Sequence, residues 1–470
     1  MAAILKILDV EILDEAYAPS IRYRPAMTAL TALGAARQSE ALAAGEATSR
    51  QLTEATLAAI EVEQSRLNAT VAVFRDEALA AADDADRRRA AGEKVPLLGV
   101  PIVVKDDLDM AGKVTGLGSH AQTRPAAEDS DLVAAIRAAG MVIVAKTTLP
   151  ELAIMGFTET EAHGITRNPH HTDHTPGGSS GGSAALVGAG AVGIATASDG
   201  AGSIRIPAAC CGLVGFKPSH GLVPSSGGWH GLSTQGCVAP HVADSAMFLD
   251  TFGSFPDALS EAAVRDPEPL RIGWSLSASA ATRPDALDPD VRAALDRTVA
   301  LLAAAGHDVR EVKIPYRLGA KALTVRYLSG IRVGTESVHD PSRLEERTRA
   351  IARLGAPFGA RAVRWANRKG EEFGASIHDE LDVDILLTPV MSGPAIPVGH
   401  WARLGAVRLV LAMNGFYAYT AQWNHAGTPA VSMPAGATTK GLPLAVQLIA
   451  RPGDDVRLMS LAGQIERGLD

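Results

Sequence analysis

Residues 176–207, PGGSSGGSAALVGAGAVGIATASDGAGSIRIP, place two glycine-rich turns on either side of a run of small apolar residues. Ser179 lies in the first turn and Ser203 in the second. Glycine permits positive φ angles and close approach of the backbone to other groups. Gly/Ser-rich stretches also form flexible linkers, but residues 184–197 are uncharged and have the composition of a protein interior. We therefore expect both turns to be anchored at a buried edge, with their N–H groups pointing inward.

The bulk composition is that of a globular protein, with 470 residues, 47% of them hydrophobic and 20% charged. The net charge of −8 argues against nucleic acid as a partner. No stretch reaches the roughly 18 uncharged apolar residues of a membrane span. Acidic residues interrupt the apolar residues of segment 1–19, so it does not resemble a signal peptide. Three cysteines, at 210, 211 and 237, do not form a disulfide framework, and we expect a cytoplasmic protein.

Lys105 ends an apolar, β-type run at residues 96–105. Lysine is rarely fully buried without a partner, so one interpretation is a surface lysine at a strand end. The other is a buried lysine held neutral to act as a base, because burial disfavours the ammonium form.

Residues 177–181 match the G-x-S-x-G pattern of a nucleophile elbow around Ser179. That elbow requires a preceding strand, and residues 168–176, which contain two prolines and three histidines, are not a core strand. A Ser-His-Asp arrangement is therefore disfavoured. The three histidines lack the helix or cysteine partners of a zinc site, and we expect solvated loop histidines and no metal.

Ser203 follows three small residues, whose N–H groups can converge on one point as an oxyanion hole requires. Asp199 and Arg205 flank this turn and can pair across it, or form an ordinary exposed pair. Lysine is one of the bases that can serve a serine nucleophile, so Lys105, Ser179 and Ser203 suggest a Ser-Ser-Lys relay.

Four segments together resemble the amidase signature family of serine hydrolases: GVPIVVKD (99–106), PGGSSGGSAA (176–185), SDGAGSIRIPAACCGLVGFKPS (198–219) and GLPLAVQLIARPGDD (441–455). The resemblance extends from about residue 25 to residue 465. It implies an α/β fold of one domain, with a large mixed β-sheet between layers of α-helices.

The resemblance also assigns roles to residues. It implies a nucleophile at Ser203, a bridging serine at Ser179 that follows a cis peptide bond, and a base at Lys105. No cofactor is implied. The backbone of Gly200, Ala201, Gly202 and Ser203 would form the oxyanion hole, and Ser180, Asp199 and Arg205 would support the site.

Two positions in the second turn depart from the family pattern. Ala201 stands where the family usually has glycine, which is tolerable if its φ angle is negative. Ser198 replaces the commoner threonine, and we expect little effect from that change.

Alternating strand and helix patterns agree with a parallel or mixed sheet covered by helices. Helices are expected at 25–65, 74–92 and 131–139, strands at 96–105, 141–146, 213–216 and 384–390, and a hairpin at 428–436 and 442–451. We expect a single domain over residues 1–470, divided into an N-terminal helical segment (1–65), a catalytic core (66–255), a helical substrate-shaping part (285–380) and closing core strands (381–455).

The substrate is less well specified than the chemistry. Candidate pocket residues, each of which can equally be core packing, are Met155, Trp229, Met391, Phe416, Tyr417, Tyr419 and Trp423. They favour small-molecule amides with apolar or aromatic groups, with carbamates (urethanes) and esters as further substrates. The alternatives are a glutamine-hydrolysing subunit of a tRNA-dependent amidotransferase and a catalytically silent binding protein. The sequence is also compatible with a homodimer.

Overall fold

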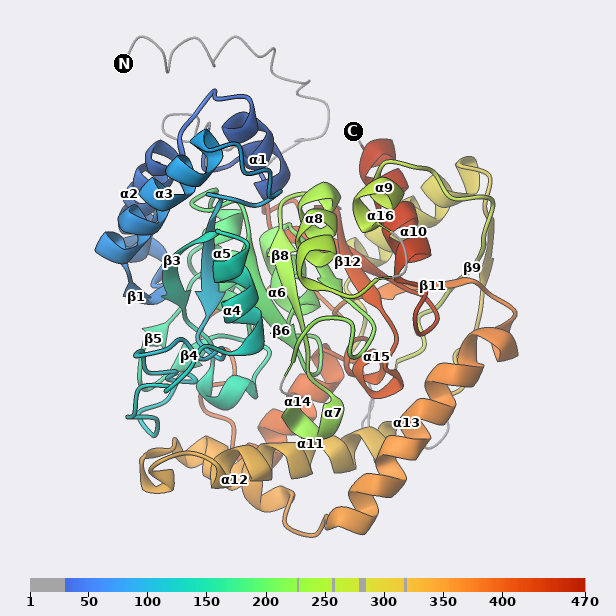
Figure 1. Ribbon diagram of the computed structural model, residues 1–470. Coiled ribbons are helices and arrows are strands. Elements are labelled where there is room, and N and C mark those ends of the chain that lie inside the picture. The colour runs from blue at the N-terminus through green and yellow to red at the C-terminus, as the bar shows by residue number, and fades with distance from the viewer. Residues whose placement is uncertain (1–29, 226–227, 256–257, 279–284, 317–318, 470) are drawn as a thin grey trace.

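The computed structural model describes residues 30–469 except 226–227, 256–257, 279–284 and 317–318. These residues form one α/β domain around a mixed sheet (Figure 1). Residues 1–29 of the expected N-terminal helical segment (1–65) lie outside the described residues.

The sheet contains 11 strands among the described residues. In spatial order they are β1 (Thr70–Val73), β3 (Val142–Thr147), β2 (Pro101–Lys105), β6 (Ala195–Asp199), β8 (Thr234–Ala239), β7 (Val214–Lys217), β12 (Ala430–Ala437), β13 (Pro443–Ile449), β11 (Ile385–Pro389), β9 (Arg271–Trp274) and β10 (Asp308–Glu311). A separate two-stranded sheet joins β4 (Glu159–Thr160) and β5 (Gly164–Ile165).

The strands run in mixed directions. β2 is parallel to both β3 and β6, whereas β6, β8, β7, β12, β13 and β11 follow one another as antiparallel neighbours. β9 is parallel to β11 and β10, and β1 is antiparallel to β3. Because β2 and β6 are parallel, their carboxyl ends meet at the same edge of the sheet.

Helices cover both faces of the sheet. Successive residues of a strand point to opposite faces of the sheet. In β2, Ile102 and Val104 belong to the apolar cluster on one face, and Val103 belongs to the cluster on the other. The first cluster packs α1 (Ala35–Ala43), α4 (Asp131–Ala138), α8 (Val242–Phe252), α9 (Leu259–Ala263), α10 (Pro289–Ala304) and α16 (Asp455–Leu469). The second packs α2 (Ser49–Leu67), α3 (Arg75–Ala90), α5 (Gly181–Gly188), α6 (Arg205–Cys211), α11 (Gly319–Glu336), α12 (Glu346–Leu354) and α14 (Ala406–Phe416).

Two long helices, α11 and α13 (Ala360–Leu381), and the shorter α12 lie beyond one end of the strands (Figure 1). In Figure 1, α11 and α12 run along the bottom of the molecule below the sheet, and α13 rises from there toward the right. The short α15 (Ala421–Ala426) packs against α13 and α11, and α7 (Gly228–Gly231) packs against α11.

The predicted α/β fold with a mixed sheet between helical layers is confirmed. The expected hairpin near the C-terminus is the antiparallel pair β12 and β13. The strand expected from residue 96 begins only at Pro101, because Gly99 adopts a φ of 79° and turns the chain just before it. The finer division into four sections stays a prediction, since one sheet draws strands from residues 70–449. No helix within the described ranges is long and apolar enough to cross a bilayer.

Replacement of Gly182 tests why helix α5 has glycine at this position. A Cβ atom there would meet Thr148 Oγ1 at 2.4 Å and the Ala69 carbonyl oxygen at 2.5 Å. We expect Gly182→Ala to destabilise the protein by about 1–3 kcal/mol through overpacking. Thermal and urea unfolding will measure the change.

The matched control is Gly334→Ala in α11, where a Cβ atom meets no described atom within 4 Å. Alanine loses less conformational entropy than glycine on folding, so the stability of this variant should equal or slightly exceed that of the wild type. Equal losses for both variants would contradict the packing explanation.

Candidate active site

The carboxyl ends of β2 and β6 bring Lys105 together with Ser198 and Asp199. Lys105 is the last residue of β2, and Ser198 and Asp199 are the last two of β6. The Lys105 N–H donates to Thr196 Oγ1 at 2.9 Å, which links the two strands just before the site. In open α/β sheets, this carboxyl edge is the usual location of ligand sites.

The first glycine turn reaches the same edge. The Gly178–Ser179 peptide bond is cis, as the family resemblance implied. Ser180 immediately precedes helix α5, and its hydroxyl contacts the N–H and the carbonyl of Ser198, both at 3.4 Å. The Ser180 N–H contacts the Ser203 carbonyl at 3.4 Å. Ser180 therefore ties the first turn both to β6 and to the second turn.

The Lys105 amine is completely buried and is surrounded by oxygen atoms. Its Nζ lies 2.8 Å from Ser179 Oγ, 2.7 Å from Ser198 Oγ and 3.2 Å from Asp107 Oδ2. Burial lowers the pKa of Lys105, because the charged form loses its hydration, and the Asp107 carboxylate opposes that shift. The interpretation of Lys105 as a surface lysine is excluded.

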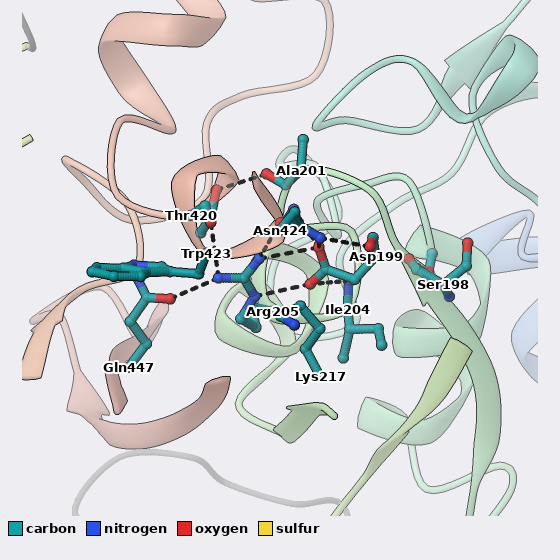
Figure 2. A network of polar contacts seen from close by, with 12 residues as sticks. Ser198, Asp199, Ala201, Ile204, Arg205, Lys217, Thr420, Trp423, Asn424 and Gln447 are labelled. Carbon is teal, nitrogen blue, oxygen red and sulfur yellow. Dashed lines mark hydrogen bonds and ion pairs between the residues drawn. The ribbon is translucent and has the colours of Figure 1, made fainter. Parts of the chain in front are cut away.

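A buried ion pair braces the second turn, as Figure 2 shows. Arg205 Nε lies 2.9 Å from Asp199 Oδ2, and both side chains are wholly buried. Arg205 also donates to the Thr420 carbonyl, to Gln447 Oε1 and to Asn424 Oδ1. The guanidinium of Arg205 holds the pKa of Asp199 well below its usual range despite the burial. The alternative of an exposed pair is therefore wrong.

The main-chain donors of the second turn divide into two groups. The Gly202 N–H donates to Asp199 Oδ1 at 2.5 Å, so it is directed away from the cavity. Gly200, Ala201 and Ser203 line the cavity, and their N–H groups meet no acceptor among the described residues. Four N–H groups were expected to form the oxyanion hole. The N–H of Gly202 differs from that expectation, because it is already bonded to the Asp199 carboxylate.

The alanine at position 201 is accommodated without strain. Gly202 has a φ of 121°, whereas Ala201 is not among the residues with positive φ. The Ala201 carbonyl accepts a hydrogen bond from Thr420 Oγ1 at 2.8 Å. The positive φ that only glycine adopts easily is therefore needed at residue 202 and not at 201.

A cavity of about 400 Å³ opens beside these groups. Ser179, Ser198 and Ser203 are among the residues that line it. Most of its other walls are apolar, and α11 contributes Leu323 and Tyr327. The rings of Trp229 and Tyr327 pack edge to face with centroids 5.1 Å apart.

The expected pocket residues divide into two sets. Met155, Trp229 and Tyr417 line the cavity. The other four are not among the described residues that line it: Met391, Phe416, Tyr419 and Trp423.

The buried members of the second set pack within the protein interior. Trp423 is completely buried and stacks on Phe373, with ring centroids 6.0 Å apart. The Met391 sulfur lies 4.0 Å from Cys210 Sγ in the core. For these two residues the alternative of core packing is the one observed, because aromatic residues and methionine are common core fillers and sequence does not show which face they occupy.

Two polar residues of the site were missed by the sequence interpretation. Asp107 was given no role, and the replacement of threonine by Ser198 was expected to matter little, yet both contact the Lys105 amine. The only local signal was that Asp107 follows Lys105 by two residues and that Ser198 precedes Asp199.

The histidine cluster before the first turn is part of the fold. His170 Nε2 lies 2.9 Å from the Cys211 carbonyl, and the Nδ1 atoms of His171 and His174 are 3.1 Å apart. Within the described ranges, no three His, Cys, Asp or Glu side chains are grouped to hold a metal ion.

The structure thus places a buried lysine and two serines beside one cavity, at the carboxyl edge of an α/β sheet. The family model "Amidase" matches residues 51–459. The chain therefore belongs to the amidase family, and it is an enzyme that hydrolyses amide C–N bonds.

Individual relatives agree with this family. A Mycobacterium tuberculosis protein named "Putative amidase AmiB2" is 44% identical over 451 residues, with 93% of this chain and 96% of that protein covered. A structure of 6-aminohexanoate cyclic dimer hydrolase complexed with substrate has a TM-score of 0.82 and 26% identity, with 93% of this chain and 97% of that chain covered. A glutamyl-tRNA(Gln) amidotransferase subunit from a Synechococcus strain is 34% identical, with 91% of this chain and 94% of that protein covered.

Replacement of Arg205 tests the brace of the second turn. Arg205→Met would leave the buried Asp199 carboxylate without its cationic partner, and we expect a loss of about 3–5 kcal/mol in unfolding free energy. The measurement is urea unfolding at pH 7.

The control is Arg37→Met, which removes the exposed ion pair between Arg37 and Glu40. Exposed pairs contribute little, so stability should stay unchanged within error. An equally small change in Arg205→Met would show that the brace is not needed.

Proposed function

We propose that the enzyme cleaves amides through an acyl-enzyme formed on Ser203, with Ser179 as proton relay and Lys105 as base. The observation that carries this proposal is the 2.8 Å contact between the buried Lys105 amine and Ser179 Oγ, in a cavity that Ser203 also lines. The lowered pKa of Lys105 supports its role as a neutral base.

In the proposed reaction, substrate binding brings Ser203 Oγ into a hydrogen bond with Ser179 Oγ. Ser203 Oγ then attacks the amide carbon while its proton passes to Ser179, whose own proton moves to Lys105. The N–H groups of Gly200, Ala201 and Ser203 stabilise the oxyanion. The C–N bond then breaks, and the proton returns from Lys105 through Ser179 to the leaving amine. Water activated by the same relay hydrolyses the acyl-enzyme and regenerates Ser203.

The nucleophile is tested by Ser203→Ala. We expect amide turnover to fall to background while the thermal unfolding temperature stays that of the wild type, because Ser203 Oγ makes no hydrogen bond with a described residue. A serine-directed fluorophosphonate should label the wild type at Ser203 and leave the variant unlabelled.

Ser342→Ala, at an exposed position, serves as the control and should keep both turnover and labelling. Persistent turnover in Ser203→Ala would reject the assignment of the nucleophile.

The lining of the cavity favours amides with an apolar or aromatic acyl group. Apolar side chains such as Leu323, Tyr327 and Met413 form much of its wall. Carbamates and small esters pass through the same tetrahedral oxyanion, and we include them in the proposal as secondary substrates.

The charge of the cavity weighs against glutamine as the substrate. Asp107 is the one charged side chain among the described residues that line it, so no arginine or lysine there can pair with the α-carboxylate of glutamine. The higher identity to AmiB2 than to the Synechococcus amidotransferase protein points the same way. A free amidase is therefore favoured over the glutamine-hydrolysing component of an amidotransferase.

Tyr327→Leu tests the aromatic preference. Loss of the ring should lower kcat/KM for an aryl amide roughly 10-fold and leave a small aliphatic amide nearly unchanged, because only the aryl substrate reaches α11. Steady-state kinetics of the isolated protein on both substrates, and on glutamine, provide the measurement.

Tyr327→Phe retains the ring and loses the hydroxyl bond to the Ile154 carbonyl, so it should keep the aryl preference. A wild-type preference in Tyr327→Leu, or hydrolysis of glutamine alone, would contradict the proposed substrate class.

A further inference from the structure

Asp107 lies where the cavity meets the buried Lys105 amine. Its Oδ2 atom accepts a hydrogen bond from Ser198 Oγ at 2.5 Å and lies 3.2 Å from Lys105 Nζ. Only 12% of its side chain is exposed. The proposed relay of Lys105, Ser179 and Ser203 does not use this carboxylate.

The protons of this cluster can be assigned from the chemistry of each group. A carboxylate only accepts, so the hydroxyl proton of Ser198 points to Asp107. The Ser198 oxygen must then accept an N–H from Lys105 at 2.7 Å. A neutral amine has two N–H groups, of which one goes to Ser198 and the other to Asp107. The remaining lone pair faces Ser179 Oγ at 2.8 Å, so that hydroxyl donates to Lys105.

The same three contacts suit the protonated amine. An ammonium group has three N–H donors, and Ser179, Ser198 and Asp107 supply three acceptors around it. The cluster can therefore gain a proton without moving a side chain.

We propose that Asp107, together with Ser198, is a positioning residue that aims the lone pair of Lys105 at Ser179 and pairs with the ammonium group formed during the reaction. This inference rests on the proposed function. In the step concerned, the Ser179 O–H bond breaks, a new N–H bond forms on Lys105, and Ser179 takes the proton of Ser203. The Asp107 carboxylate keeps its charge throughout and exchanges no proton.

The other charged groups near Lys105 have partners of their own. Asp199, at the end of β6, is paired with Arg205. Asp106, next to Lys105 in the chain, lies 3.0 Å from Lys146 of β3. Asp107 is thus the carboxylate in direct contact with the Lys105 amine in the described part of the chain, and Asp199 raises the pKa of Lys105 by a smaller effect.

Asp107 also sets how strong a base Lys105 is. Burial lowers the pKa of Lys105, whereas the Asp107 carboxylate raises it. A base must be neutral before the reaction and still basic enough to take a proton during it. The opposed effects of burial and of Asp107 meet these two needs.

Asp107→Asn tests the inference, because it keeps the shape and removes the charge. The free enzyme needs neutral Lys105, so kcat/KM rises with pH through the pKa of Lys105. Without the carboxylate that pKa falls, and we expect the acid limb of the kcat/KM profile to move to lower pH. We also expect kcat to fall roughly 10- to 100-fold, because the ammonium group loses a charge-assisted partner.

The matched control is Asp109→Asn, which removes an exposed carboxylate two residues away in the same loop. It should leave both the acid limb and kcat at wild-type values. Asp107→Ala carries the same expectation as Asp107→Asn and replaces it if thermal unfolding shows that the asparagine variant does not fold.

The outcomes separate this inference from the proposed function. A wild type that hydrolyses no amide and is not labelled at Ser203 would remove the proposed function itself. An active, labelled wild type with an unmoved acid limb in both Asp107 variants would overturn the role of Asp107 alone. A purely structural role would lower kcat without moving the limb, and that result would also overturn it.

Discussion

The Nζ atom of Lys105 is a completely buried amine whose three nearest polar partners are oxygen atoms. Removing a cation from water is costly, so this position favours the neutral amine. The surrounding structure supplies the oxygen atoms from three separate segments: the loop after β2, the turn before α5 and the end of β6. The architecture of this part of the molecule serves to bring these segments to one point.

The sheet and the glycine turns meet that requirement together. Parallel neighbours β2 and β6 end at the same edge, which places Lys105 beside Ser198. The contacts of Ser180 hold the first turn against β6. The second turn is fixed by the buried Arg205, which reaches Asn424 and Gln447 in the C-terminal part of the chain. Residues more than 200 positions apart thus determine the shape of one short turn.

The ion pair between Arg205 and Asp199 also determines which main-chain N–H groups of the second turn face the cavity. Asp199 accepts a hydrogen bond from the N–H of Gly202, whereas Gly200, Ala201 and Ser203 line the cavity. An alanine is compatible with this arrangement because the positive φ falls on Gly202. Arg205 and Asp199 therefore affect the proposed oxyanion hole without touching a substrate.

Local patterns in the sequence determined much of this protein. The apolar run that ends at Lys105, the glycines around Ser179 and Ser203, and the alternation of strands and helices are encoded within short segments, because they reflect backbone preference and burial. Only the tertiary structure decided which oxygen atoms surround Lys105 and which N–H group is bonded to Asp199. It also decided that Trp423 and Met391 lie in the core. Those features depend on contacts between segments far apart in the chain, and composition and spacing do not specify such contacts.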